Sequence, residues 1–121
     1  MFCLKVVDGL SAGIEIPLKQ GGTTSVGRAA DADGIIEDQL CSGKHFEIDW
    51  TAAGMILKDL GSLNGVFING ERVREPRQVK RGDFVQCGTT LMEVTMSSGA
   101  QEVKVSDRAP ALKGAAAMIM D

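Results

Sequence analysis

Aromatic residues are scarce in this chain, which has four Phe, one Trp and no Tyr among its 121 residues. The interior must therefore be built mainly from Val, Ile, Leu and Met. A stacking platform for single-stranded nucleic acid is not expected, because such platforms present several exposed rings.

Long apolar runs are absent as well. No window approaches about eighteen consecutive apolar residues, and the first residues show no basic segment followed by a long apolar stretch. We therefore expect no insertion into a membrane, no cleaved leader and a location in the cytoplasm.

Cysteine and histidine are too few for the usual metal or disulfide frameworks. Cys3, Cys41 and Cys87 are an odd number, widely spaced and without a C-x-x-C pair, which favours a reducing compartment. Cys41 and His45 alone do not make a zinc site, because zinc usually takes four ligands and the chain has a single His. Cys41 and Cys87 are both expected to be core residues.

An enzyme is not expected either. Ser42 and His45 lack the Gly-x-Ser-x-Gly elbow, and no third member of a triad is evident. The sequence predicts no catalytic residue, no metal and no cofactor.

The formal net charge of −3 gives no field that would draw the whole protein onto nucleic acid or an acidic membrane. Residues 72–81 are the exception, with five basic residues and one acid. Such a run is typical of a solvated edge that discourages pairing between sheets, and the alternative is contact with nucleic acid or an acidic partner. The scarcity of aromatic residues disfavours the nucleic-acid alternative.

Short apolar runs with frequent turn signals extend from residue 2 to about residue 96, a pattern that predicts an all-β sandwich or barrel. Alternation places strands at residues 2–7 and 14–18, and Phe46, Ile48 and Trp50 on one face of a further strand. Residues 55–60 form its partner strand.

Two turn signals define the later strands. Asn69-Gly70 predicts a tight hairpin between residues 66–68 and 71–73, since both residues tolerate positive φ. Gly82-Asp83 opens a final pair of strands that turns at Gly88.

The composition becomes polar and then Ala-rich after Met96. We expect a domain over residues 1–97 and a tail over residues 98–121. The tail is predicted to be flexible, or to form a short helix over residues 111–120, which would be marginal in isolation.

Three segments carry the functional signal: Gly27-Arg28, then Ser42-Gly-Lys-His45, then Asp59-Leu-Gly-Ser-Leu-Asn-Gly65. In this order, and followed by Asn69-Gly70, they resemble the forkhead-associated family over roughly residues 2–96. Asp33, Ile36 and Asp38 also occupy positions where that family has Asp, an apolar residue and Asp.

The resemblance implies an antiparallel β-sandwich of eleven strands whose loops at one end bind a phosphothreonine peptide without catalysis. By the same resemblance, the phosphate would be bound by Arg28, Ser42, Gly43 and Lys44, and the peptide by Leu63 and Asn64, while Gly27, His45 and Gly65 would be structural.

These residue types suit that chemistry. A phosphate monoester carries about −1.5 to −2 charges and three acceptor oxygens, so its receptor needs a fixed cation and several converging donors. Arg28 offers a planar fork of donors, Ser42 a hydroxyl, and Asn64 an amide that both donates and accepts. The alternatives are a surface arginine at residue 28, and at residue 64 an asparagine chosen only for its turn.

Two positions depart from the family. Gly43 stands where Arg, Lys or Asn is common, with the basic residue shifted to Lys44, and Leu63 stands where Ser or Thr is common. A hydrogen bond to a charged group contributes roughly 1.5–3 kcal/mol, so loss of one or two would weaken binding about tenfold to several-thousandfold.

The sequence thus leaves two functions open. The first is an adaptor that recognises a threonine-phosphorylated partner in trans in a kinase-regulated pathway. The second is a scaffold or assembly module that keeps the fold and binds partners without phosphate. The sequence does not indicate an oligomeric state.

Overall fold

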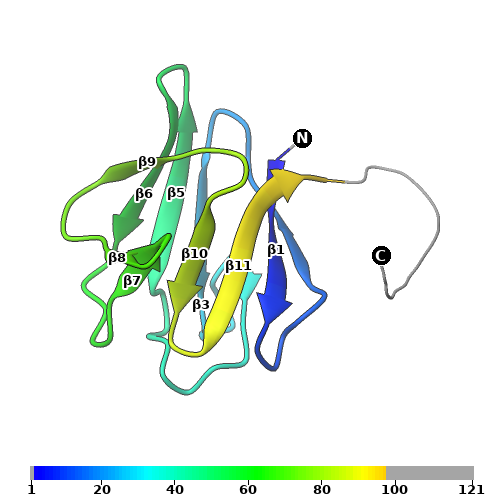
Figure 1. The fold of residues 1–121 in the computed structure, drawn as a ribbon, viewed down its shortest axis with the longest axis vertical. Coiled ribbons are helices and arrows are strands. Elements are labelled where there is room, and N and C mark those ends of the chain that lie inside the picture. The colour runs from blue at the N-terminus through cyan, green and yellow to red at the C-terminus, as the bar shows by residue number, and fades with distance from the viewer. Residues whose placement is uncertain (1, 98–121) are drawn as a thin grey trace.

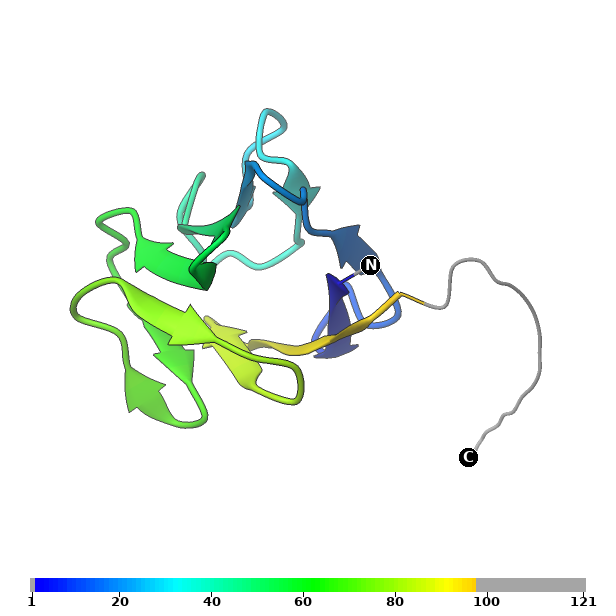
Figure 2. The same cartoon turned by 90° about the horizontal axis from the view of Figure 1, so that it is seen from above.

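The computed structural model describes residues 2–97, which form eleven β-strands in two sheets packed face to face (Figures 1 and 2). No helix occurs in this part of the chain. The all-β sandwich of about eleven short strands is confirmed, whereas the helix expected over residues 111–120 lies outside the described residues.

The strands in chain order are β1 (Phe2–Asp8), β2 (Glu15–Pro17), β3 (Thr23–Gly27), β4 (Gly34–Ile35), β5 (Phe46–Thr51), β6 (Gly54–Asp59), β7 (Val66–Ile68), β8 (Glu71–Arg72), β9 (Arg77–Val79), β10 (Phe84–Cys87) and β11 (Thr90–Met96).

One sheet has the order β2-β1-β11-β10-β7-β8 and the other the order β4-β3-β5-β6-β9. Eight of the strand pairs are antiparallel, and the exception is the two-residue parallel pair of β3 and β4, in which Val26 lies opposite Gly34. This short pair is the one departure, among the described strands, from the antiparallel pairing of the sandwich. It arises because the loop over residues 28–33 returns the chain to the side of β3.

Aliphatic side chains fill the space between the sheets, as the shortage of rings predicts. Alternation along β5 buries Phe46 and Ile48 completely, and Trp50 is half-buried at the end of the same face. There Trp50 packs edge-to-face against Phe2, with ring centroids 5.5 Å apart. Burial of this apolar surface is the main source of stability.

The hairpin at Asn69-Gly70 forms as predicted. Both residues have positive φ, 50° and 86°, and Ile68 lies opposite Glu71 across the turn. The Asn69 side chain also accepts the amide of Phe84 at 2.9 Å, which fixes the hairpin to β10. The turn residues therefore specify the strand register here.

The two ends of the described chain lie together at one end of the sandwich, since Phe2 pairs with Met96. The turn between β10 and β11, which contains Gly88 and Thr89, lies at the opposite end with the loops over residues 28–33, 36–45 and 60–65 (Figure 1). These loops are at the lower end of the molecule in that view.

Asp38 joins the loop over residues 36–45 to this turn. Its carboxylate is buried and accepts hydrogen bonds from the Thr90 hydroxyl at 2.7 Å, the Thr89 amide at 2.8 Å and the Leu40 amide at 3.0 Å. Burial raises the pKa of Asp38, but these hydrogen bonds outweigh it, and the pKa lies below its ordinary value of 3.8. A Cβ at Gly88 would approach the same carboxylate to 2.7 Å, so a side chain there would disturb the contact.

The Asp38 contact makes a testable contribution to stability. Because the folded pKa is depressed, its stabilisation is present above pH 3.8 and is lost as the pH falls through the folded pKa. Asp38→Asn should lower the free energy of unfolding by about 2 kcal/mol at pH 7, and by progressively less on acidification. Urea denaturation of both proteins between pH 7 and pH 3 measures this difference.

The matched control is Asp31→Asn, which alters an exposed carboxylate on the neighbouring loop. Its effect should stay within about 0.5 kcal/mol. If both variants lose the same free energy of unfolding, or if the loss in Asp38→Asn does not change with pH, the carboxylate contacts contribute little.

Candidate functional site

The predicted site residues come together on three loops at one end of the sandwich (Figure 1). Arg28 begins the loop after β3, residues 42–45 end the loop before β5, and residues 63–65 end the loop before β7. Sequence segments almost forty residues apart thus form one surface.

His45 connects these loops from the interior of the sandwich. Its ring is fully buried; Nδ1 accepts the Ser42 amide at 2.9 Å, and Nε2 donates to the Gly65 carbonyl at 2.7 Å. An amide can only donate and a carbonyl can only accept, so these partners require the neutral tautomer with its proton on Nε2. The main chain of His45 adds bonds to Val26 at 2.8 Å and Leu60 at 3.0 Å.

These bonds define what His45 can do. The Ser42 group that contacts the ring is its backbone amide, and the hydroxyl takes no part. The two residues are therefore not arranged as a nucleophile and its base, and His45 lies beneath the surface on which a ligand would bind.

Gly27 allows two loops to touch through their backbones. A Cβ at this position would lie 2.0 Å from the Gly43 carbonyl oxygen and 2.9 Å from the His45 nitrogen. The φ of Gly27 is not positive, so no left-handed backbone conformation calls for glycine at this position. The structure instead requires glycine because no space exists for a side chain.

Arg28 is exposed and is held by the loop across from it. Its amide donates to the Ser42 carbonyl at 3.1 Å, and its Nε donates to the Cys41 carbonyl at 3.0 Å. No carboxylate among residues 2–97 forms an ion pair with it. The guanidinium is thus oriented through Nε, and its two amino nitrogens remain for an anion.

Ser42 lies beside Arg28 and is half-buried. Its hydroxyl oxygen accepts the Leu63 amide in a long bond of 3.4 Å, which leaves the hydroxyl proton for an acceptor. The amides of Gly43 and Lys44 form no hydrogen bond with any other described residue. Successive free amides of this kind are suited to an anion.

The Lys44 side chain is directed to the neighbouring loop, where its Nζ lies 3.5 Å from Asp31 in an exposed ion pair. Lys44 is therefore the weaker candidate for a phosphate cation. Gly43 has room for a side chain, because a Cβ there would meet only the Ala29 Cβ, at 3.4 Å.

Asn64 lies on the last loop and is exposed. Its side-chain nitrogen donates to the Leu40 carbonyl at 2.7 Å, which ties this loop to the one that carries Ser42. Gly65 follows with φ of 83°, and Leu63 before it is 86% exposed. The Asn64 amide oxygen remains for a peptide N–H, and the Leu63 side chain offers only apolar contact.

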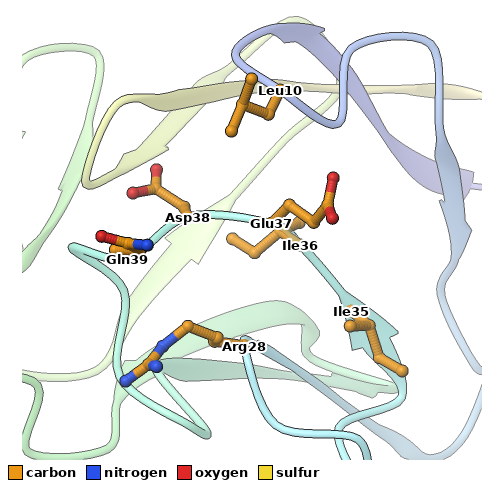
Figure 3. Close-up of a pocket in the computed structure, with 7 residues that line it drawn as sticks. All are labelled: Leu10, Arg28, Ile35, Ile36, Glu37, Asp38 and Gln39. Atoms are coloured by element: carbon orange, nitrogen blue, oxygen red, sulfur yellow. The ribbon is translucent and has the colours of Figure 1, made fainter.

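A shallow pocket adjoins Arg28. Figure 3 shows Arg28 on one side and Leu10 on the other, with residues 35–39 between them. Leu10 and Ile35 are exposed, so the pocket combines apolar walls with the guanidinium. This pocket was not predicted, because Leu10 belongs to the β1–β2 loop, far from the motif segments.

Sequence reasoning also missed the proximity of Cys41 and Cys87. Their sulfur atoms lie 3.1 Å apart, and a His45 ring nitrogen is within 4.8 Å of both. Three potential metal ligands therefore cluster, but both His45 nitrogens already form hydrogen bonds. The two cysteines are 46 residues apart, and only the packing of the loop onto β10 brings them together.

None of residues 2–97 forms a helix long and apolar enough to cross a membrane.

Comparisons with known proteins agree with the fold and the motifs. The sequence profile of the FHA (forkhead-associated) domain matches residues 24–88. The glycogen accumulation regulator GarA of Mycolicibacterium smegmatis is 38% identical over 85 residues, which are 70% of this chain and 52% of that protein. The chain thus spans about half the length of this relative.

Two solved structures share the architecture. One is the FHA domain of FhaA, a Mycobacterium tuberculosis protein, in complex with the intracellular domain of Rv3910. It has a TM-score of 0.70 and 31% identity, covering 78% of this chain and 99% of that one. The other comes from work on phosphothreonine-dependent FHA domain interactions, with a TM-score of 0.69 and 30% identity, covering 79% of this chain and 96% of that one.

The profile covers more than half of the chain, and the sandwich and its loop motifs agree with it. This chain belongs to the FHA domain family.

Proposed function

We propose that this protein binds a phosphothreonine peptide on a partner protein in trans, within kinase-regulated signalling, and catalyses no reaction. The observation that carries the proposal is the position of Arg28 beside Ser42 on loops that are already joined by hydrogen bonds. A cytoplasmic location, where protein kinases act, belongs to the same proposal.

The donors of this site suit a phosphate. The Arg28 amino nitrogens, the Ser42 hydroxyl and the amides of Gly43 and Lys44 all lie on adjacent loop positions. A phosphothreonine has three strongly accepting oxygens and nearly two negative charges, and charge-assisted bonds to such a group are short and strong. Because the loops are held before the ligand arrives, little ordering is needed on binding.

Relatives support the proposal. One similar FHA domain was solved in work on phosphothreonine-dependent interactions, and the FhaA domain was solved with the intracellular domain of another protein. These ligands belong to those proteins. Their sandwiches are similar to this one, and this chain has the Gly27-Arg28 and Ser42-x-x-His45 segments on the loops described above.

The pocket beside Arg28 is proposed to receive an apolar side chain of the same peptide. Leu10 is 83% exposed and Ile35 is 48% exposed, so contact with an apolar group would remove both from water. Binding to a library with varied residues around the phosphothreonine would show this preference.

A second candidate function is a scaffold that binds without phosphate. Leu40 and Leu63 favour it, since they are 51% and 86% exposed around the same loops and offer apolar contacts. The two candidates differ in whether removal of the phosphate abolishes binding.

Arg28→Ala provides the direct test. The variant should bind a phosphothreonine peptide about ten- to a hundredfold more weakly, because a charge-assisted bond contributes roughly 1.5–3 kcal/mol. Affinities for phosphorylated and plain peptides from an oriented library, measured by calorimetry or fluorescence polarisation, give the result.

Arg81→Ala is the matched control, since it removes an exposed cation from the basic run and leaves the loops intact. Its affinity should stay near that of the unaltered protein. If plain and phosphorylated peptides bind equally well, or if Arg81→Ala weakens binding as much as Arg28→Ala does, the adaptor function is wrong.

Gly43→Arg and Leu63→Thr should strengthen phosphopeptide binding. Each substitution restores a donor type that is common in the family, and both positions have room for the new side chain. We expect a gain of about three- to tenfold for each, less than a full charge-assisted bond because an exposed side chain must be ordered.

The plain threonine peptide is the control for these two variants, and its affinity should not change. A gain of equal size for the plain peptide would mean that the new side chains contact something other than phosphate.

A further inference from the structure

We propose that Cys41 and Cys87 are a site of reversible oxidation, at which hydrogen peroxide converts the two thiols into a disulfide beneath the ligand loops. The chemistry does not depend on the proposed function. Only its effect on peptide affinity rests on that function.

The geometry brings the two sulfur atoms almost into bonding distance. They lie 3.1 Å apart, and a disulfide bond is about 2.05 Å long, so a closure of about 1 Å is needed. Both residues are buried, with 2% and 0% of their surface exposed. The pair is therefore enclosed: neither thiol can reach a thiol of a second protein molecule, and the oxidant must be as small as hydrogen peroxide.

The two residues differ in freedom to move. Cys87 lies in β10 between two partner strands, opposite Val66 on β7 and Thr90 on β11. Cys41 lies in the loop over residues 36–45, where its amide closes a turn onto the Asp38 carbonyl at 3.0 Å. The closure must therefore come mainly from Cys41.

The pair also differs in reactivity. Contact with Cys87 lowers the pKa of the Cys41 thiol, although burial opposes this, and the pKa of Cys87 is raised by the same neighbour and by burial. The thiolate is the nucleophilic form of cysteine. Cys41 is thus the residue that reacts with peroxide, and Cys87 is the residue that resolves the product.

The reaction balances in two steps. The Cys41 sulfur attacks one peroxide oxygen; a sulfur–oxygen bond forms, the oxygen–oxygen bond breaks, and the product is a sulfenic acid with one water. The Cys87 sulfur then attacks the Cys41 sulfur; the disulfide forms, the sulfur–oxygen bond breaks, and hydroxide leaves with the Cys87 proton as a second water. The two thiols are oxidised by two electrons in total, and the peroxide is reduced.

Disulfide formation acts on the proposed ligand site through the main chain. The Cys41 carbonyl holds Arg28 Nε at 3.0 Å, and the next residue, Ser42, is bonded to His45. Movement of Cys41 toward β10 shifts this carbonyl relative to Arg28 Nε and so weakens the hydrogen bond between them. Peptide affinity should then fall by about two- to tenfold, the loss of one modest hydrogen bond.

A metal is the competing use of the same cluster, which also includes His45. Two sulfur ligands on a tetrahedral zinc ion lie about 3.8 Å apart. The observed 3.1 Å is shorter, and both His45 nitrogens are already used. The arrangement therefore fits two thiols close to joining.

The experiment treats the reduced chain of 121 residues with hydrogen peroxide and follows its intact mass. We expect a loss of about 2 Da that dithiothreitol reverses. Proteolytic mapping without reductant should recover one cross-linked peptide pair that contains Cys41 and Cys87. The melting temperature should rise by at least about 5 °C, because the cross-link closes a long loop of the unfolded chain.

Cys3→Ala is the matched control, because Cys3 is also buried but lies in β1. This variant should still lose about 2 Da, whereas Cys41→Ala and Cys87→Ala should not. Proteolytic mapping of the unaltered protein identifies the cross-linked cysteines even if a variant fails to fold. Peptide titrations of oxidised and reduced protein then test the effect on affinity separately.

Three results would overturn the proposal. They are a disulfide that involves Cys3, stable oxygen adducts on Cys41 without a cross-link, or peroxide-treated protein in which all three thiols still react with an alkylating reagent after unfolding. A zinc-dependent rise in melting temperature that Cys87→Ala abolishes would assign the cluster to a metal instead. If the cross-link forms and no phosphopeptide binds either form, the oxidation site stands and the proposed function fails.

Discussion

The arrangement of the three loops that carry the candidate site depends on one buried side chain, His45, which has a hydrogen-bond partner on each ring nitrogen. One nitrogen holds the chain at Ser42 and the other holds it at Gly65, while the backbone of His45 continues the pairing of β3 with β5. A buried polar ring is stable only when its partners are present, so each loop requires the others. Gly27 completes the contact from the opposite side, where its lack of a side chain lets the Gly43 backbone approach.

Local patterns in the sequence predict much of this fold. Asn69-Gly70 specifies its hairpin through backbone conformation alone, and alternation along residues 46–50 identifies the buried face correctly. The ordered motifs also place the candidate site residues on converging loops, although their roles toward a ligand stay a prediction. These successes share a cause: the relevant physics acts between residues that are close in the chain.

Contacts between distant segments could not be predicted in the same way. The approach of Cys41 to Cys87 depends on how a loop packs against β10, and the pairing of Lys44 with Asp31 depends on the relative path of two loops. The reason for Gly27 was likewise hidden, because a close backbone approach leaves no local signal that separates it from a turn. The basic run over residues 72–81 was predicted only in part. Its residues contribute to β8 and β9, which are edge strands and so agree with the expected solvated edge, but the sequence did not show that they lie in two different sheets.

The pairing of Phe2 with Met96 sets a limit on intramolecular binding. Both ends leave the sandwich at the end away from the loops, and β11 alone spans seven residues, or about 23 Å. A phosphothreonine joined covalently to either end would have to travel back along that length, which takes at least about seven extended residues of tether. A shorter tether gives an effective concentration near zero at Arg28, and longer ones give values that first rise and then decline. A phosphothreonine within about seven residues of either end of the described chain therefore cannot reach Arg28 of the same molecule, and only a more distant one can bind intramolecularly.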